Sequence, residues 1–550
     1  MCVAGEMKDD VQKLEFTEKA LMMKDPFAHE LSMHEDIGEC LAWQTGRSAE
    51  EIMHEREVAT KLIEEKGQSF WQAGRCAEWF EGADPAVAHI AREVNGPLCE
   101  YLCERLVCLL CDDVCFVRSF VAACVVRCDH VDKEVPELFR KGGPLYGCLP
   151  HCGMGEAVEC EESIGDVGAL HDDSSRSNRV LVSQVRDDVQ AGELHKIIMK
   201  DAAKGWMTEP VLSSEVGPDG GRAVPGRGVA QLRADGSTKV RAVFDFSWSA
   251  PAPEQQGRRP PRKEAKARSI NGCTWLPEKC SHDHLDNLVQ FCRELVMLCG
   301  IVPMLFKADI ASAFRRIPLM PAHRWAAGIM YLFHGEVLRA THMSCPFGAT
   351  ASVHNWERVG RLLRKIARKI LHIALFEYVD DYFAAERPEV AEHAMQCFAR
   401  VVRAVLGEAA IAVDKLMFGS TLEVLGVTVK LMHDRFTMSP CEKKMQKCLA
   451  VMREALAEGG ILRRGCASKL AGRLQWSTQF LFHRLGRAMI RPIFAQIYKG
   501  WNCTVGSELR EALSWWCKVL ELGIVEERFW ERSEAPLAHV FVDACGKSSR

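Results

Sequence analysis

The sequence contains no apolar run long enough to cross a membrane. A membrane-spanning helix needs about 18 or more apolar residues, and the apolar segment 114–126 is shorter and contains Arg118. Residues 1–10 are charged and lack the apolar core of a secretory signal. We therefore expect an intracellular protein, cytoplasmic or nuclear, that has no membrane partner.

The sequence also lacks an excess of charge of one sign. It has 70 Lys and Arg residues against 74 Asp and Glu residues, a formal net charge of −4. Global charge therefore does not indicate a nucleic-acid-binding protein, and any positive surface must be local. Basic residues do cluster locally at helical spacing, either as phosphate-contacting helix faces or as ordinary solvated ones. The clusters are a row of Arg358, Arg361, Arg364, Lys365, Arg368 and Lys369, and a row of Arg463, Arg464, Arg473, Arg484, Arg487 and Arg491.

Cysteine is abundant, with 25 residues, but no disulfide framework is expected in a long chain without a secretory signal. The cysteines between 101 and 116 follow helical spacing, which favours small buried hydrophobic side chains. A structural zinc site is the alternative. It would start from Cys108 and Cys111, or from the segment Cys148-Leu-Pro-His151-Cys152, but neither has a clean second pair at zinc-finger spacing.

The patterns along the 550 residues predict an α+β protein of several domains without long-period repeats. Residues 1–180 are mostly helical in pattern and carry no chemical motif. A strand pair over 229–248, with Asp235-Gly236 as its turn, follows a helix at about 183–204. Residues 285–300 form an amphipathic helix, 301–430 alternate strands and helices, and 440–520 are helical. A short apolar strand near the end carries Asp543.

Two short segments carry carboxylates in a pattern that favours chemistry. Asp309 ends the apolar strand 304–310, although a lone Asp in such a place is more often a turn or cap residue. Asp380 and Asp381 lie between aromatic, β-prone residues in 376–383, which predicts a tight hairpin that carries the acids at its turn. Because neighbouring strand residues point to opposite faces, we expect Asp380 to be the main partner of Asp309 and Asp381 to point more to the side.

Such a group of acids suits two-metal nucleotidyl transfer. Two divalent ions about 3.5–4 Å apart activate an attacking hydroxyl and neutralise a leaving pyrophosphate. Mg²⁺ prefers oxygen ligands and keeps several waters, so two or three carboxylates suffice to hold it. The sequence therefore predicts two Mg²⁺ ions at this site, with Mn²⁺ as a possible substitute.

The segments DIASAFRRIP, CPFG and YVDD, in this order, resemble motifs A, B and C of reverse transcriptases. The resemblance covers roughly residues 241–476, and its style is closer to retrotransposon enzymes, including the tyrosine-recombinase (DIRS-like) class, than to retroviral ones. It implies an RNA-directed DNA polymerase of a mobile element that uses an RNA or DNA template, a primer and dNTPs. The implied right-hand architecture has fingers at 181–300, a palm at 301–430 and thumb or connection helices at 431–530. Residues 531–550 would be the first strand of an incomplete RNase H-like domain.

The resemblance also assigns the metal ligands and the nucleotide pocket. Asp309, Asp380 and Asp381 match the metal-binding acids, and the carbonyl of Ile310 would also face the metal. Phe314 matches the steric gate that disfavours a 2′-hydroxyl, which implies selection of deoxynucleotides.

Further positions match motif B and the fingers strand. Phe347 and Gly348 match motif B, where retroviral enzymes often have Gln in place of Phe347. Glycine at 348 would permit close approach to nucleotide or template. Arg241 and Lys239 match a strand that grips the triphosphate, and the alternative for both is an exposed strand edge.

Downstream, Lys415 resembles the motif D lysine that protonates the leaving pyrophosphate, with a simple surface charge as the alternative. Leu425 and Gly426 resemble the tight turn of a primer grip. A decayed or domesticated nucleic-acid-binding relic of such an element is the main alternative function. Viral RNA polymerases usually have Gly before the paired acids, where this chain has Tyr378-Val379, and nucleotide cyclases lack the fingers strand and the thumb-like helices.

Overall fold

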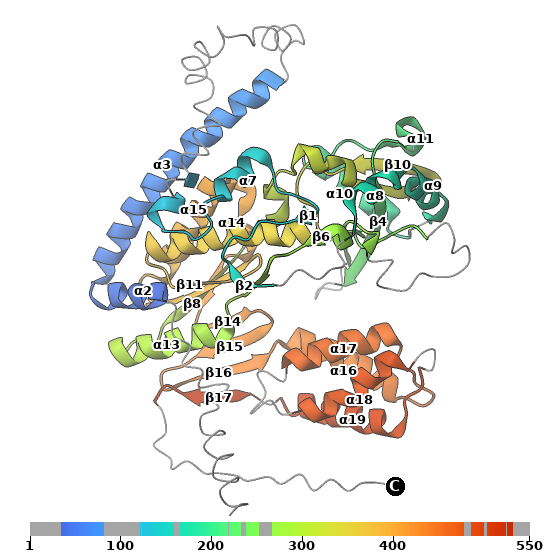
Figure 1. Ribbon diagram of the computed structural model, residues 1–550. Coiled ribbons are helices and arrows are strands. Elements are labelled where there is room, and N and C mark those ends of the chain that lie inside the picture. Colours follow the sequence, from blue (N-terminus) through green and yellow to red (C-terminus); the bar gives the residue numbers. More distant parts are fainter. Residues whose placement is uncertain are drawn as a thin grey trace, which may run out of the picture. The chain divides into compact units, whose positions relative to one another are not determined.

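Figure 1 shows the computed structural model of the chain. The structure describes residues 35–81, 121–122, 124–158, 165–186, 188–217, 219–232, 238–251, 267–477, 486–499, 503–523 and 525–531. The predicted turn Asp235-Gly236 and the strand around Asp543 lie outside these ranges. The chain divides into two compact units, one formed by Met1–Phe291 and Met304–Phe418, the other by Cys292–Pro303 and Gly419–Arg550.

The first unit is built around a four-stranded sheet of order β11-β12-β8-β13. Strand β8 pairs in antiparallel fashion with β12, and β12 with β11. The strands are β8 (Met304–Asp309), β11 (Leu375–Tyr378), β12 (Asp381–Glu386) and β13 (Met417–Gly419). The predicted strand before Asp309 and the predicted hairpin around Asp380 are thus confirmed.

Two amphipathic helices supply most of the apolar core of this sheet. Helices α14 (Thr350–Lys369) and α15 (Ala391–Leu406) bury nearly continuous apolar faces, which include Trp356, Leu363 and Phe398. α14 contacts β11, and α15 contacts β8 and β12. The core lies between these helices and the buried side chains of the strands, such as Phe306 and Tyr382.

A second sheet of the first unit has five strands in the order β3-β10-β9-β4-β5. Its strands are β3 (Val211–Leu212), β4 (Ala223–Leu232), β5 (Thr238–Phe244), β9 (Gly328–Phe333) and β10 (Glu336–Thr341). β4 and β9 run parallel, and β4 pairs with β5 in antiparallel fashion from Gly226↔Phe244 to Leu232↔Thr238. The predicted strand pair is therefore confirmed, and β5 forms an edge of this sheet.

Shorter elements complete the first unit. They are α7 (Val135–Lys141), β1 (Gly147–Cys148), β2 (Gly155–Ala157), α8 (Val167–Asp172), α11 (Ser213–Val216), η2 (Asn271–Cys273), β6 (Thr274–Trp275), β7 (Glu278–Cys280), η3 (Ala313–Arg316), η4 (Pro321–Ala326), η5 (Glu408–Ala410) and η6 (Val413–Lys415). β1 pairs with β6 and β2 with β7, so the segment after α7 is joined to the segment before α13 (Leu285–Cys299). The helix predicted at 285–300 matches α13.

The helix predicted at 183–204 is wrong in extent, because the structure has two helices, α9 (Ser174–Gln184) and α10 (Ala191–Ala202). Asp188 lies between them. One of its carboxylate oxygens accepts the Gln190 N–H at 2.9 Å and the other accepts the Gly228 N–H at 2.6 Å. Aspartate in such a turn competes with helical hydrogen bonding, which explains the break.

The N-terminal helices are part of the first unit. Helix α2 (Glu35–Thr45) contacts α14, and α3 (Ala49–Glu81) contacts α15, as Figure 1 shows at the blue end of the chain. Arg56 is fully buried and donates to both carboxylate oxygens of Glu386 at 3.0 and 3.1 Å. Gln44 donates to the same carboxylate at 3.0 Å. The helical pattern predicted for the N-terminal region is confirmed over 35–81.

The second unit pairs a sheet with a group of helices. The sheet has the order β14-β15-β16-β17, with β14 (Thr421–Val424), β15 (Val427–Leu431), β16 (Arg435–Pro440) and β17 (Glu526–Phe529). The helices are α16 (Glu442–Leu456), α17 (Arg464–Ser477), α18 (Arg487–Tyr498) and α19 (Ser507–Glu521), which share an apolar cluster around Leu470, Ile493 and Trp516. The helices predicted over 440–520 are confirmed, but β16 and β17 were not foreseen within 431–530. β16 alternates buried and half-buried residues, which is the pattern of a strand.

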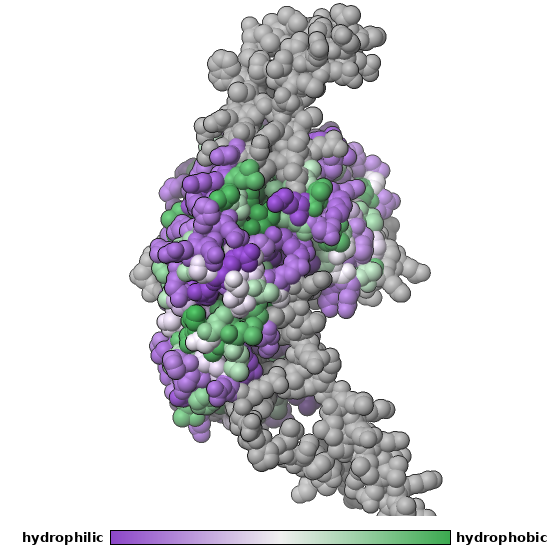
Figure 2. Space-filling model, turned by 90° about the vertical axis from the view of Figure 1, so that its left-hand side faces the viewer, coloured by the Kyte–Doolittle hydropathy of each residue, from purple (hydrophilic) through white to green (hydrophobic). Residues whose placement is uncertain are grey.

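Figure 2 shows a face on which hydrophilic residues predominate and apolar residues form smaller patches between them. Within the described ranges, no helix combines the length and the apolar character that a membrane crossing requires.

Candidate active site

The three predicted acids lie at one end of the four-stranded sheet. Asp309 is the last residue of β8, and Asp381, the first residue of β12, lies directly opposite it in the strand register. Directly opposed residues of an antiparallel pair place their side chains on the same face. The backbone N–H of Ile310 donates to the carbonyl of Asp380 at 3.1 Å, which fastens the turn to the end of β8. The register differs from the sequence expectation, because Asp381 shares its face with Asp309 and does not point aside.

The turn that carries Asp380 has an unusual backbone. Val379 has a φ of +58°, in the left-handed region that a β-branched residue rarely adopts. Its carbonyl accepts a hydrogen bond of 2.7 Å from the indole Nε1–H of Trp356. Trp356 lies on α14 and is fully buried. Sequence reasoning missed this residue, because only the fold brings the helix and the turn together.

The pKa values of Asp380 and Asp381 are raised by burial and by neighbouring carboxylates. Partial burial, followed by the charges of Asp380 and Asp309, raises the pKa of Asp381 to about 6. Burial and the charge of Asp309 also raise the pKa of Asp380, against the opposing effect of Lys415 and Arg241. Clustered negative charge of this kind favours a bound cation.

Lys415 is the nearest cation that the structure provides. It ends η6, and its Nζ donates to Oδ2 of Asp309 at 2.6 Å while about half of the side chain stays exposed. The carboxylate oxygens of the three aspartates do not all lie within 4.8 Å of one another. Other groups of three potential metal ligands in the described residues do meet this limit. Lys415 therefore offsets part of the negative charge of Asp309.

The predicted steric gate lies on η3, shortly after Asp309. Phe314 is half-buried and packs against the core, and its ring centroid lies 6.1 Å from that of Phe347. Phe347 is 51% exposed. The two rings form an aromatic pair that reaches solvent.

Gly348 is required by a contact within the fold. Its φ is +99°, and a Cβ on this residue would lie 2.3 Å from the carbonyl oxygen of Phe244 at the end of β5. Asn271 holds the same turn, because its Nδ2 donates to the Gly348 carbonyl at 3.0 Å and its Oδ1 accepts the Thr350 N–H at 2.8 Å. Glycine here is explained by this approach to β5. Asn271 was not singled out from the sequence, since its partners lie almost eighty residues away.

Arg241 and Lys239 are both exposed on β5, two residues apart and hence on the same face of an edge strand. Arg241 lowers the pKa of Asp380 through its charge, so its guanidinium lies near the acids. The charge of Lys239 is not among the main causes of the pKa shifts of Asp380 and Asp381. The structure thus favours Arg241 over Lys239 as the group closer to the site.

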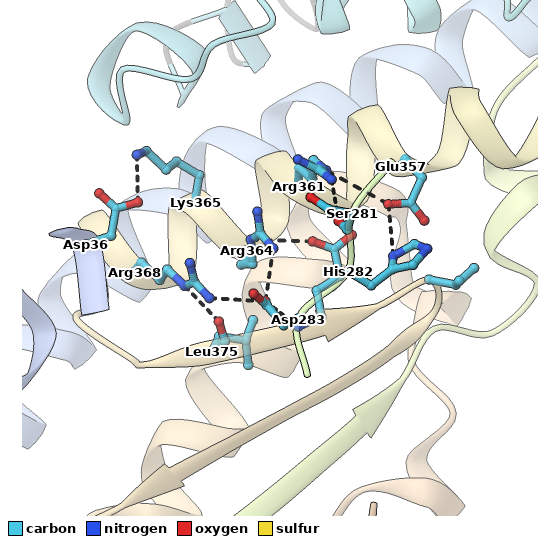
Figure 3. A network of polar contacts seen from close by, with 12 residues as sticks. Asp36, Ser281, His282, Asp283, Glu357, Arg361, Arg364, Lys365, Arg368 and Leu375 are labelled. Carbon is cyan, nitrogen blue, oxygen red and sulfur yellow. Dashed lines mark hydrogen bonds and ion pairs between the residues drawn. The ribbon is translucent and has the colours of Figure 1, made fainter. Parts of the chain in front are cut away.

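The basic row on α14 is not a free positive face, which corrects the sequence expectation (Figure 3). Arg364 and Arg368 donate to Asp283 at 2.9 and 3.2 Å, and Arg368 is fully buried. The remaining members also have partners in the fold: Arg358 pairs with Asp132, Lys365 and Lys369 with Asp36, and Arg361 donates to the Ser281 carbonyl. These residues hold α14 to its neighbours, because their acidic partners come from segments far away in the sequence.

The second unit carries the predicted primer-grip turn. Leu425 and Gly426 have φ values of +50° and +78° and connect β14 to β15, whose residues Val424 and Val427 are paired. Two central residues with positive φ are typical of a tight hairpin turn. In the same unit, Arg463, Arg464, Arg473, Arg487 and Arg491 are exposed, and Arg484 lies outside the described ranges.

No family model and no curated protein matches the sequence. The fold is similar to solved structures of the foamy viral protease-reverse transcriptase. One such structure, with double-stranded DNA, has 15% identity and a TM-score of 0.41 and covers 68% of this chain and 52% of that one. A complex with an RNA/DNA hybrid has 14% identity and a TM-score of 0.40 and covers 61% and 37%. A further complex with double-stranded DNA has 15% identity and a TM-score of 0.40 and covers 71% and 67%. At this level of similarity, function has to be inferred from the chain's own residues.

Proposed function

We propose that the chain is a reverse-transcriptase-type DNA polymerase that extends a primer with dNTPs along an RNA or DNA template. The observation that supports this most directly is the meeting of Asp309, Asp380 and Asp381 at the end of one antiparallel sheet. The raised pKa values of Asp380 and Asp381 indicate a site whose charge is incomplete without a cation.

The donor atoms fit Mg²⁺, a hard cation that prefers carboxylate and carbonyl oxygens. In nucleotidyl transfer, two such ions activate the attacking 3′-hydroxyl and stabilise the leaving pyrophosphate. Asp309, Asp380 and Asp381 would hold them, with the carbonyl of Ile310 as a further ligand and with Mn²⁺ as a possible substitute.

The remaining residues would position the substrates. Arg241, with Lys239 beside it, would bind the triphosphate of the incoming nucleotide through charge-assisted hydrogen bonds. Phe314, backed by Phe347, would exclude a ribose 2′-hydroxyl, and Gly348 holds the turn that carries Phe347. Lys415, whose Nζ lies 2.6 Å from Oδ2 of Asp309, would donate a proton to the leaving pyrophosphate. Leu425 and Gly426 would contact the primer.

The motifs point to a retrotransposon enzyme, of the DIRS-like class or a related one, and hence to a mobile element. Residues 181–300 would be the fingers, 301–430 the palm and 431–530 the thumb. Residues 531–550 would begin an RNase H-like domain, and 532–550 lie outside the described ranges.

Primer extension on an RNA template with Mg²⁺ and dNTPs tests the proposal. Wild-type chain should extend the primer, Asp380→Asn should not, and Asp172→Asn should match wild type, because Asp172 is an exposed acid at the end of α8. Extension by Asp380→Asn at the wild-type rate would refute the metal assignment. Binding of an RNA/DNA hybrid without any extension would instead support a catalytically decayed relic.

A further inference from the structure

A second group of potential metal ligands lies away from the three aspartates. Cys152, Glu278 and His354 come from three separate segments: the loop before β2, the start of β7, and α14. All three are buried, and one ligand atom from each lies within 4.8 Å of the others. The thiol Sγ of Cys152 is 3.9 Å from Nε2 of His354. Figure 1 shows β2 close to α14.

We propose that this cluster is a structural zinc site, with Cys152, His354 and Glu278 as ligands and the neighbouring His151 as the fourth. Nε2 of His151 lies 3.9 Å from Oε2 of Glu278, and its side chain is 51% exposed. His151 thus stands at the solvent side of an otherwise buried group, where an ion could enter. The proposal does not depend on the polymerase activity.

The separation between Cys152 and His354 is close to that of two ligands in a tetrahedral zinc site. With Zn–S of about 2.3 Å and Zn–N of about 2.0–2.1 Å, a sulfur and a nitrogen ligand lie about 3.5 Å apart. The observed 3.9 Å would need only a small movement of either side chain. Cysteine, histidine and carboxylate are the ligands that zinc prefers, whereas Mg²⁺ prefers oxygen alone.

The carboxylate of Glu278 is already fixed in place. It accepts the backbone N–H of Cys152 at 2.9 Å, of Met154 at 2.7 Å and of Gly155 at 3.3 Å. These bonds wrap the loop around the carboxylate, so that the sulfur of Cys152 is held beside it. Hydrogen bonds from the surrounding backbone orient metal ligands in this way.

The local charges also suit a divalent ion. A thiolate and a carboxylate balance the two positive charges of zinc, so the filled site would be neutral and could be buried at little cost. Arg358, which acts electrostatically on Cys152 and His354, is balanced by its ion pair with Asp132 at 2.6 Å.

Zinc at this position would join three parts of the first unit. The ribbon formed by β2 and β7 would be fastened to α14, two residues before Trp356. Its expected role is to brace the helix whose indole contacts the turn at Asp380.

Metal analysis of the purified full chain tests the proposal. After removal of metal with a chelator and reconstitution with zinc, wild type should bind one tightly held zinc ion per chain. Cys152→Ser and His354→Ala should lose it. Cys148→Ser is the matched control, because Cys148 is an exposed cysteine outside the cluster and should keep the ion. Asp380→Asn should also keep it, which separates this site from the three aspartates.

Replacement of zinc by Co²⁺ gives a spectroscopic readout of the cysteine ligand. Wild type should show the thiolate-to-cobalt charge-transfer absorption of a site with one cysteine ligand, and Cys148→Ser should show the same band. Wild type that retains no zinc, or that binds Co²⁺ without this band, would overturn the proposal. So would a Cys152→Ser chain that keeps both its zinc and the band.

Discussion

The hydrogen bond between Trp356 and the carbonyl of Val379 allows a sharp test of how the turn at Asp380 is held. Trp356→Phe removes the indole Nε1–H donor while keeping an aromatic ring in the core. A lost hydrogen bond to a partly buried carbonyl costs about 1–2 kcal/mol. The smaller ring adds about 1–2 kcal/mol through the space left behind. We expect the free energy of unfolding of the first unit to fall by roughly 2–4 kcal/mol.

For function, the loss of kcat in Trp356→Phe should matter more than the loss of stability. Without the indole, nothing else that the structure shows binds the Val379 carbonyl, and the backbone of Val379 can leave its strained φ of +58°. A shift of about 1 Å in a catalytic group can cost about 100-fold in rate. Trp356→Phe should therefore lower kcat of primer extension by roughly 10–100-fold and leave KM for the dNTP almost unchanged.

Trp325→Phe is the matched control. Trp325 is a half-buried tryptophan of the same unit, and its Nε1–H donates to the Tyr146 hydroxyl at 2.9 Å, without contact to the turn at Asp380. It should lower the melting temperature in a similar way but keep kcat. If both variants lose stability and both keep wild-type kcat, Trp356 does not position the turn, and the reasoning is refuted.

The remaining predictions concern the charges and the gate of the site. Because the pKa of Asp381 is raised to about 6, the folded chain binds this proton more tightly than the unfolded chain, and the carboxylate destabilises the fold as pH rises through about 4 to 6. At pH 8, Asp381→Asn should thus stabilise the metal-free chain by about 1 kcal/mol, after allowance for solvent screening. At pH 4 it should not stabilise the chain. An equal gain at both pH values in thermal melts would contradict this. Lys415→Met removes the cation beside Asp309 and should raise the pKa of Asp380 and Asp381 further. The acidic limb of the pH–rate profile should therefore move to higher pH. An unmoved limb would exclude this electrostatic role. Phe314→Val should increase incorporation of ribonucleotides relative to deoxynucleotides by roughly tenfold or more, measured as a ratio of kcat/KM, and an unchanged ratio would remove the gate assignment.

The parts of the site that could be predicted from the sequence are those encoded locally. An apolar strand before Asp309, and paired acids between β-prone aromatic residues, need only a few neighbours to be recognised. The relation between Asp381 and Asp309 could not be predicted, because it depends on the register of two strands that lie about seventy residues apart in the chain.

The partners of buried polar groups also could not be predicted from the sequence. The basic residues of α14 have the spacing of a phosphate-binding face, but Asp36, Asp132 and Asp283 reach them from segments distant in sequence. For the same reason, only part of the proposed zinc site around Cys152 could be predicted from the sequence. His151 is its neighbour in the chain, whereas Glu278 and His354 approach it only in the folded unit.

The buried pair of Arg56 and Glu386 has a consequence for how the chain is synthesised and how it can be cut. During translation, Arg56 leaves the ribosome 330 residues before its carboxylate partner does, so α3 cannot complete its packing until most of the first unit has been made. A truncated chain that begins at 181 would leave Glu386 in an apolar environment without Arg56 and Gln44, at a cost of about 3–5 kcal/mol. Expression of an isolated catalytic fragment should therefore succeed only if residues from 35 onward are retained.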